Sequence, residues 1–162
     1  MARITYEDPI KVFRYRVLVP GWDQGAGFSE CLGLNVENDV VEYREGGMLD
    51  TPQKSPGLQK FGDITLRRGQ FFSGKSRDSE FIIWCQSVNR VTLGLGGTDL
   101  VLRKELVIRQ YNNRNEAVVD WYIKEAWPRT YKPMSDMNGN SSENSIEELV
   151  LTHEGFTQTR FM

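Results

Sequence analysis

Apolar and polar residues alternate along much of this chain with the two-residue period of a β-strand. In residues 61–68, for example, Ile64 and Leu66 fall on one face and charged or polar residues on the other. The same period predicts strands over residues 10–19, 35–44, 61–68, 100–111, 117–127 and 146–153, and a short strand broken by Gly33 over 28–34. The polar link of residues 112–116 predicts that the strands on either side of it form an antiparallel hairpin.

One segment has the period of a helix instead. Phe81, Trp84, Cys85 and Val88 follow the spacing i, i+3, i+4, i+7 and make one apolar stripe, which predicts a short helix over residues 79–87. A helix with one apolar stripe packs over a sheet, so we expect a packing role for its tryptophan and cysteine rather than a cofactor role.

Two segments lack either period. Residues 48–60 contain Pro52, Pro56 and Gly57 and few apolar residues, which predicts an extended loop, and residues 131–145 predict a polar loop. The chain has no internal repeat and no low-complexity tract, so we expect a single domain over residues 1–162. Several strands and one helix predict a mainly β fold, an antiparallel β-sandwich or partial barrel. The edge strands of such a sheet leave backbone groups unpaired and need a neighbour.

Composition narrows the function. Of 162 residues, 39% are hydrophobic and 26% charged, and 20 basic against 22 acidic residues give no basic excess of the kind that nucleic-acid binders carry. The first residues show no apolar signal core and no run approaches the ~18 apolar residues of a membrane span, so we expect synthesis in a cytoplasm and no membrane insertion. We expect Cys31 and Cys85 to be reduced and buried.

Chemistry-bearing motifs are sparse. His153 is the sole histidine, and no nucleophile motif accompanies it. The glycine-rich stretch 94–97 lacks the Lys-Ser/Thr ending of a phosphate loop and predicts a turn. Acidic residues cluster in 37–45 and 147–154, where alternation along a strand favours a solvated or interface face over an acid/base pair. We therefore predict no catalytic, metal or cofactor site.

Six short motifs follow one another along the chain: GFSECLGL (27–34), VVEYREGG (40–47), PG with FGDITLRRG (56–57 and 61–69), Trp84, Trp121 with AWP (126–128), and EELVLTHEG (147–155). Their order resembles that of the tail tube proteins of contractile phages. They cover about residues 10 to 156 in the family's order. The loop over residues 134–144 belongs to this chain alone, and the family helix is often longer.

The resemblance implies a structural subunit and not an enzyme. Family subunits form hexameric rings whose inner strands join into one β-barrel around a channel, and the rings stack inside a contractile sheath. Implied partners are further copies of the chain, the sheath protein, baseplate, spike and terminator proteins, and cargo protein or DNA in the lumen. The mature site would be a phage tail or an injection particle. Head-to-tail stacking is a contact that grows a filament, and ring closure removes exposed sheet edges.

Residues for these contacts can be named as expectations. Candidates for the subunit or ring interface are Glu42, Tyr43, Arg44, Leu49, Thr51, Lys54, Leu58, Arg67, Arg68 and Glu154. Core candidates are Phe28, Leu66, Trp84, Val88, Trp121, Trp127, Leu149 and Leu151. We expect the lumen to follow strands 36–44 and 61–68, with 100–109 or 117–126 as further candidates.

Two other functions remain open at this point. A monomeric ligand-binding β-sandwich would use Trp22, Trp121 or Trp127 as a platform. A carboxylate hydrolase would use the region of Glu147, Glu148 and Glu154. Electron microscopy distinguishes both from a tube subunit, because rings or tubes of uniform width would support only the tube.

Overall fold

The computed structural model describes residues 10–21, 27–44, 52–69, 77–94, 102–140 and 142–161, with backbone only for residues 77–81 and 89. Nine strands and one helix follow one another along these residues. They are β1 (Tyr15–Leu18), β2 (Glu30–Leu32), β3 (Val36–Tyr43), β4 (Gln53–Phe61), β5 (Ile64–Gly69), α1 (Arg77–Thr92), β6 (Lys104–Tyr111), β7 (Ala117–Lys132), β8 (Ile146–Thr152) and β9 (Gly155–Arg160). No helix within this part of the chain is long and apolar enough to cross a membrane.

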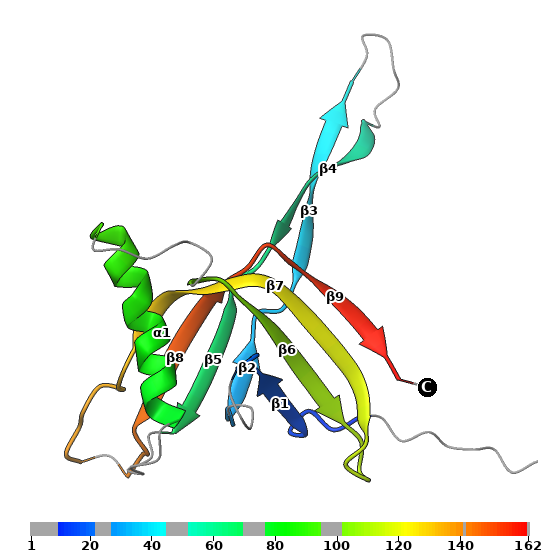
Figure 1. Ribbon diagram of the computed structural model, residues 1–162. Helices are drawn as coiled ribbons and strands as arrows, with labels where there is room; N and C mark the ends of the chain where they lie inside the picture. The colour runs from blue at the N-terminus through cyan, green and yellow to red at the C-terminus, as the bar shows by residue number, and fades with distance from the viewer. Residues whose placement is uncertain are drawn as a thin grey trace, which may run out of the picture.

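Seven strands form one bent antiparallel sheet in the order β1-β6-β7-β8-β5-β2, with β9 also pairing to β7. The bend lies in β7, whose first half pairs with β6 and β9 and whose second half pairs with β8. Glu125 stands between the halves with a φ of 51°, a left-handed conformation that turns the strand. We call β1, β6, the first half of β7, and β9 sheet A, and the second half of β7, β8, β5 and β2 sheet B (Figure 1).

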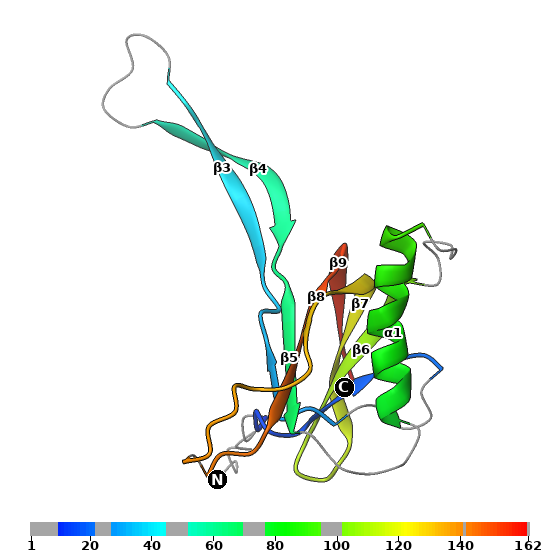
Figure 2. The same cartoon turned by 90° about the vertical axis from the view of Figure 1, so that its left-hand side faces the viewer.

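The core fills the space between the two halves. Its buried side chains come from sheet A (Val17, Leu106, Ile108, Ile123), from sheet B (Ile64, Leu66, Leu149, Leu151) and from α1 (Trp84, Cys85). Figure 2 shows α1 beside this bent sheet. The indole N–H of Trp84 donates to the carbonyl of Leu102 at 2.7 Å, which satisfies its polar group inside the core. This mainly β architecture with an unclosed sheet and one helix agrees with the fold predicted from the sequence.

A two-stranded ribbon of β3 and β4 projects from this body (Figures 1 and 2). We call the described residues 36–44 and 52–61 the arm. Pairing runs from Val36↔Phe61 at the body end to Tyr43↔Gln53, with an irregular register between Asn38 and Val40.

The arm corrects the prediction of an extended loop over residues 48–60. Strand β4 begins at Gln53 in spite of Pro56 and Gly57, and residues 48–51 lie outside the described part of the chain. A two-stranded ribbon has open edges, where proline is tolerated. Gly57 lies opposite the irregular register of β3, where the two backbones come close together. A Cβ at this position would lie 3.0 Å from the carbonyl oxygen of Asp39.

Other boundaries also shift. Helix α1 extends beyond the predicted residues 79–87, because no glycine or proline follows until Gly94, whose φ of 69° ends the helix. Strand β7 runs through Lys132, so the predicted polar loop over 131–145 begins later, at residue 133. The strands predicted over 10–19 and 100–111 are shorter, and β9 was not predicted at all.

Candidate assembly surfaces

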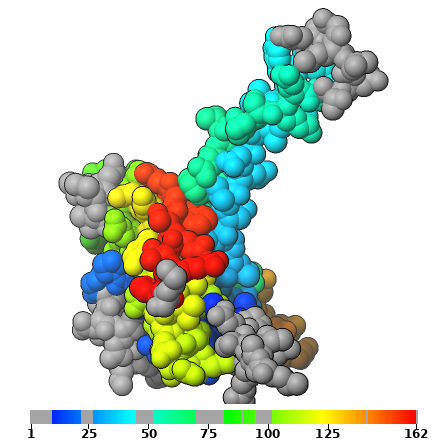
Figure 3. All heavy atoms as spheres, turned by 90° about the vertical axis from the view of Figure 1, so that its right-hand side faces the viewer, coloured from blue at the N-terminus to red at the C-terminus, as the bar shows by residue number. Residues whose placement is uncertain are grey.

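The arm exposes apolar side chains that its own chain does not cover. Val40 is 61% exposed, Leu58 76% and Tyr43 58%, and Val36 and Val41 are exposed as well. None of the described arm side chains is buried. Figure 3 shows the arm standing clear of the body. Two ion pairs along it, Lys54–Glu42 at 3.4 Å and Lys60–Asp39 at 2.8 Å, join exposed groups and add little stability. An isolated two-stranded ribbon is at best marginally stable in water, so the arm needs a partner surface.

Two glycines let the connections between arm and body touch each other. A Cβ on Gly33, which has a φ of 88°, would lie 2.1 Å from the carbonyl oxygen of Asp63. A Cβ on Gly62 would lie 1.8 Å from Oδ1 of Asn35. The two connections therefore cross in close contact, which fixes where the arm leaves the body.

Open strand edges form a second candidate surface. β2 and β9 each pair with one neighbour among the described strands, β2 with β5 and β9 with β7. The last four residues of β9, Thr157–Arg160, are exposed, and Figure 3 shows this strand at the surface near the base of the arm. Unpaired edges are templates for pairing with another chain.

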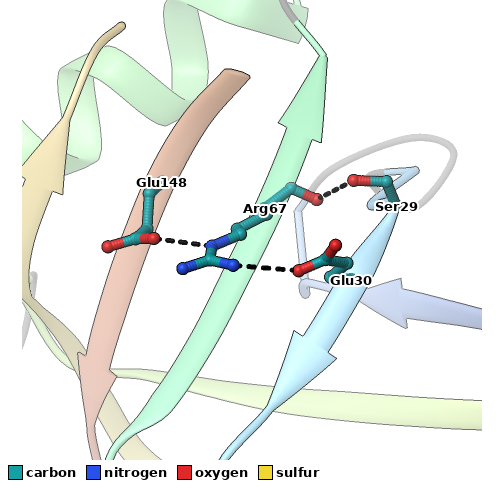
Figure 4. A network of polar contacts seen from close by, with 4 residues as sticks. All are labelled: Ser29, Glu30, Arg67 and Glu148. Carbon is teal, nitrogen blue, oxygen red and sulfur yellow. Dashed lines mark hydrogen bonds and ion pairs between the residues drawn. The ribbon is translucent and has the colours of Figure 1, made fainter. Parts of the chain in front are cut away.

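The outer face of sheet B carries charges that compensate one another (Figure 4). Arg67 on β5 bridges two carboxylates, with its Nε 2.6 Å from Glu148 on β8 and a terminal nitrogen 3.1 Å from Glu30 on β2. The hydrogen bond to Glu148, with that to Glu30, raises the pKa of the guanidinium. Ser29 ties β2 further by donating to the Arg67 carbonyl at 3.0 Å. This network joins three strands on a face whose charges are largely paired.

The next residue along β5 points the other way. Arg68 faces the core side and forms an ion pair with Glu147, and both side chains are about one-tenth exposed, at 11% and 10%. Tyr131 donates to the same carboxylate at 3.1 Å. The alternation of β5 therefore separates Arg67, on the outer face, from Arg68, which is held inside this subunit.

The remaining interface candidates lie on two parts of the molecule. Glu42, Tyr43, Arg44, Lys54 and Leu58 are exposed on the arm, Glu154 is exposed after β8 and paired with Arg103, and Leu49 and Thr51 lie outside the described residues. Among the core candidates, Leu66, Trp84, Leu149 and Leu151 are buried. Phe28 and Trp121 are partly buried against the core, and Val88 and Trp127 are partly buried.

Val36, Val40 and Val41 are exposed apolar residues that the sequence reading did not single out. The sequence did contain a signal, because Val40 and Val41 are adjacent in an acidic segment. Adjacent residues point to opposite faces of a strand, whereas a strand covered on one side needs only one apolar face.

The geometry gives no support to the alternative sites. Glu147 faces the core and Glu148 the outer face, and Glu147, Glu148 and Glu154 each pair with a different arginine, so they do not converge. Trp121 packs against the core and Trp22 lies outside the described residues. In the described part of the chain, no three His, Cys, Asp or Glu side chains gather to hold a metal ion.

A groove of about 310 Å³ lies between α1 and β7, lined by Ile82, Cys85, Gln86, Val88, Pro128, Arg129 and Tyr131.

Comparisons with known proteins agree with one another. The profile of the family described as T4-like virus tail tube protein gp19 matches residues 11–157. A search of the curated proteins found no match. Among solved structures, a chain of the PVC sheath-tube complex, from an extracellular contractile injection system in the extended state, is 25% identical, with a TM-score of 0.74 over 96% of this chain and 94% of that chain.

Two further structures share the fold. A chain of the anti-feeding prophage cap, the AFP tube terminating cap, is 22% identical with a TM-score of 0.77, and 99% of this chain and 97% of that chain are covered. A chain of the anti-feeding prophage baseplate is 19% identical with a TM-score of 0.75, covering 96% of this chain and 98% of that chain.

Proposed function

Because the chain belongs to the T4-like virus tail tube protein family, we propose that its copies form hexameric rings that stack into a tube with a central channel. The chain is a structural tail tube protein and not an enzyme. The sheath, baseplate and terminating cap are the proposed partners, since similar chains occur in structures of a sheath-tube complex, a baseplate and a tube cap. Spike proteins and cargo are further proposed partners, and the mature site is a phage tail or an injection particle.

The observation that carries this proposal is the arm. Its exposed apolar residues cannot reach the core of their own subunit, and its length places them away from the body (Figure 3). Burying a Val or Leu side chain contributes about 1.5–3 kcal/mol. Covering Val40, Val41 and Leu58 on another copy would therefore supply a favourable contact in every subunit, which repetition along a tube multiplies.

Open edges supply the second part of the proposal. A neighbour that pairs with the free edges of β2 and β9 would satisfy their backbone groups and remove a hazard of aggregation. Each added hydrogen bond contributes only about 1 kcal/mol. The stiffness of the tube therefore comes from many such bonds repeated around each ring.

We propose the outer face of sheet B as the channel wall. It includes strand β5, which overlaps the segment 61–68 that was expected to follow the lumen. Its carboxylates at Glu30 and Glu148 share the cation of Arg67. A wall of paired charges binds neither acidic nor basic cargo strongly, so cargo can slide. Salt-dependent binding of DNA to assembled tubes would contradict this assignment.

The decisive experiment uses electron microscopy and sedimentation velocity on three proteins. The unmodified chain should form rings or tubes of uniform width, in the presence of sheath protein if necessary. The double variant Val41→Glu/Leu58→Glu should remain monomeric with an unchanged circular dichroism spectrum. Met137→Glu, at a site 78% exposed outside the arm, is the matched control and should assemble normally.

Each result separates the functions. Normal tubes from the double variant would show that the arm is not an assembly contact. An unmodified chain that stays monomeric with sheath and baseplate proteins would refute the tube itself and favour the ligand-binding module.

A further inference from the structure

A buried histidine lies where the arm meets the body. His153 follows β8, is 7% exposed, and its ring reaches the connection between β4 and β5. Its Nε2 lies 2.9 Å from the carbonyl oxygen of Gly62, and the backbone N–H of Gly155 donates to its Nδ1 at 3.1 Å. Because Nδ1 accepts a hydrogen bond, Nε2 must carry the proton and donate to Gly62. The neutral ring thus joins the β8–β9 bend to the root of the arm.

Aromatic rings enclose this contact. The ring centroid of Phe61, the last residue of β4, lies 5.8 Å from that of His153 and 6.0 Å from that of Phe156. Gly155 has a φ of 145°, and a Cβ there would lie 3.3 Å from the Phe61 ring. The end of the arm is therefore packed on His153 as well as bonded to it.

The connection that leads into β3 is held by the connection between β4 and β5. The N–H of Gly62 donates to the carbonyl of Asn35 at 3.1 Å, so both strands of the arm depend on where Gly62 lies. The carbonyl of the same residue is the acceptor of the His153 bond. One imidazole therefore acts on both strands of the arm at the point where they leave the body.

We propose that neutral His153 is a positioning residue that sets the direction of the arm, and that protonation of this ring releases the arm and blocks assembly. The proposal rests on the proposed function in one respect only, the arm's role in assembly. A doubly protonated ring has two N–H donors and no acceptor. Its Nδ1–H would then face the N–H of Gly155, and the buried cation would push that contact apart.

The charged groups around the ring already have partners. Asp63, beside Gly62, accepts from Thr152 at 2.9 Å and pairs with Arg129. Glu154, the next residue in the chain, pairs with Arg103.

On the arm side, Lys60 is bound to Asp39 at 2.8 Å. Lys124 of β7, opposite Gly155 in the strand register, adds a further positive charge. Asp63 and Glu154, which are the chain neighbours of Gly62 and His153, are thus both paired with arginines.

The chain makes this proposal sharply testable because it contains one histidine. Histidine is the side chain whose ordinary titration falls between about pH 5 and 8. A pH-dependent change that disappears when this one residue is replaced can therefore be assigned to His153.

The primary experiment measures the arm's direction in the monomer by pulsed electron paramagnetic resonance. Spin labels are attached at Leu58→Cys on the arm and Asn113→Cys in the β6–β7 turn, in a background of Cys31→Ser and Cys85→Ala. The label at position 58 also occupies the proposed assembly contact, which keeps the labelled protein monomeric. The native histidine is compared with His153→Gln, whose amide nitrogen can still donate to Gly62. The second comparison is His153→Asn, which can accept from Gly155 but is too short to reach Gly62.

At pH 7.5 we expect one narrow distance for His153 and for His153→Gln, and loss of that distance for His153→Asn. At pH 5.5 the histidine protein should lose the narrow distance and His153→Gln should keep it. Equal distance distributions at both pH values in the histidine protein would overturn the proposal. The same broadening at pH 5.5 in His153→Gln would also overturn it, because the pH effect would then come from carboxylates and not from His153. A narrow distance in His153→Asn, with circular dichroism showing a folded protein, would remove the positioning role. If His153→Asn fails to fold, the pH comparison between histidine and glutamine decides.

Assembly is then followed with unlabelled proteins. Tubes of the histidine protein should be lost on acidification from pH 7.5 to 5.5, and tubes of His153→Gln should persist. Histidine tubes that persist at pH 5.5 would contradict the release step. Absence of tubes at every pH, even with sheath and baseplate proteins present, would refute the proposed function, whereas the distance measurement on the monomer would still decide the role of His153.

Discussion

The ion pair between Arg109 and Asp120 gives a strong test of how the body of the subunit is stabilised. These residues are cross-strand partners on β6 and β7, joined by two hydrogen bonds of 2.8 and 2.7 Å. Asp120 is 0% exposed, whereas the Arg109 side chain is 32% exposed and lies over the ring of Phe161. The hydrogen bonds that Arg109 donates to Asp120 raise the pKa of the Arg109 guanidinium further above its ordinary value, so the arginine stays charged at every pH of interest.

The unequal burial predicts unequal costs for removing the two partners. Arg109→Leu leaves a carboxylate buried without its cation, which costs about 3–5 kcal/mol. Asp120→Asn leaves an arginine that can turn toward water, and the loss of charged hydrogen bonds costs about 1.5–3 kcal/mol. The double variant Arg109→Leu/Asp120→Leu should be more stable than Arg109→Leu alone, since it removes the stranded charge.

The assay is urea unfolding followed by circular dichroism at pH 7.5. All variants are placed in the Val41→Glu/Leu58→Glu background, because association would otherwise add to the measured stability. Equal destabilisation by Arg109→Leu and Asp120→Asn, or a double variant less stable than Arg109→Leu, would refute this reasoning.

Three further predictions concern other parts of the body. Gly33→Ala should lower the unfolding free energy by about 1–3 kcal/mol, because its φ of 88° and a Cβ 2.1 Å from the Asp63 oxygen are both unfavourable, and a thermal melt checks it. Burial raises the pKa of both Cys31 and Cys85 to about 11, so both thiols stay protonated at pH 8. A disulfide reagent should therefore react slowly with the native protein and quickly with the protein unfolded in urea. Fast reaction of the native protein would contradict this prediction. Leu151→Ala, at a site 0% exposed, should cost about 2–5 kcal/mol in urea unfolding, and a cost within experimental error would show that the site is not core.

The sequence predicted the strands whose two faces differ within one subunit. In β5, Leu66 is buried and Arg67 lies on the outer face, and the alternation of residues is enough to indicate this. The apolar stripe of α1 likewise predicted a helix that buries Trp84 and Cys85. These elements follow their own local pattern because each has one side against the core.

Elements whose structure depends on distant partners were missed. β9 contains one large apolar residue, Phe156, and forms because its backbone pairs with β7. The burial of Asp120 could not be foreseen either, because its partner Arg109 lies on the preceding strand and the register was unknown. The burial of His153 could not be foreseen, because it depends on Phe61 at the root of the arm, which packs against the His153 ring. In each case the missing information was a contact between strands and not the character of the residue.

Of the two strands of the arm, β3 was predicted as a strand and β4 was predicted as part of an extended loop. The segment of β4 contains Pro56 and Gly57, and it has no buried residue in this subunit that would mark one face of a strand. Val40 and Val41 are adjacent and point to opposite faces of a strand, yet both are exposed. A ribbon with apolar residues on both faces can be buried only between two other surfaces. In the proposed tube those surfaces belong to neighbouring copies, so the burial that would mark β4 as a strand is supplied by the assembly and not by the chain itself.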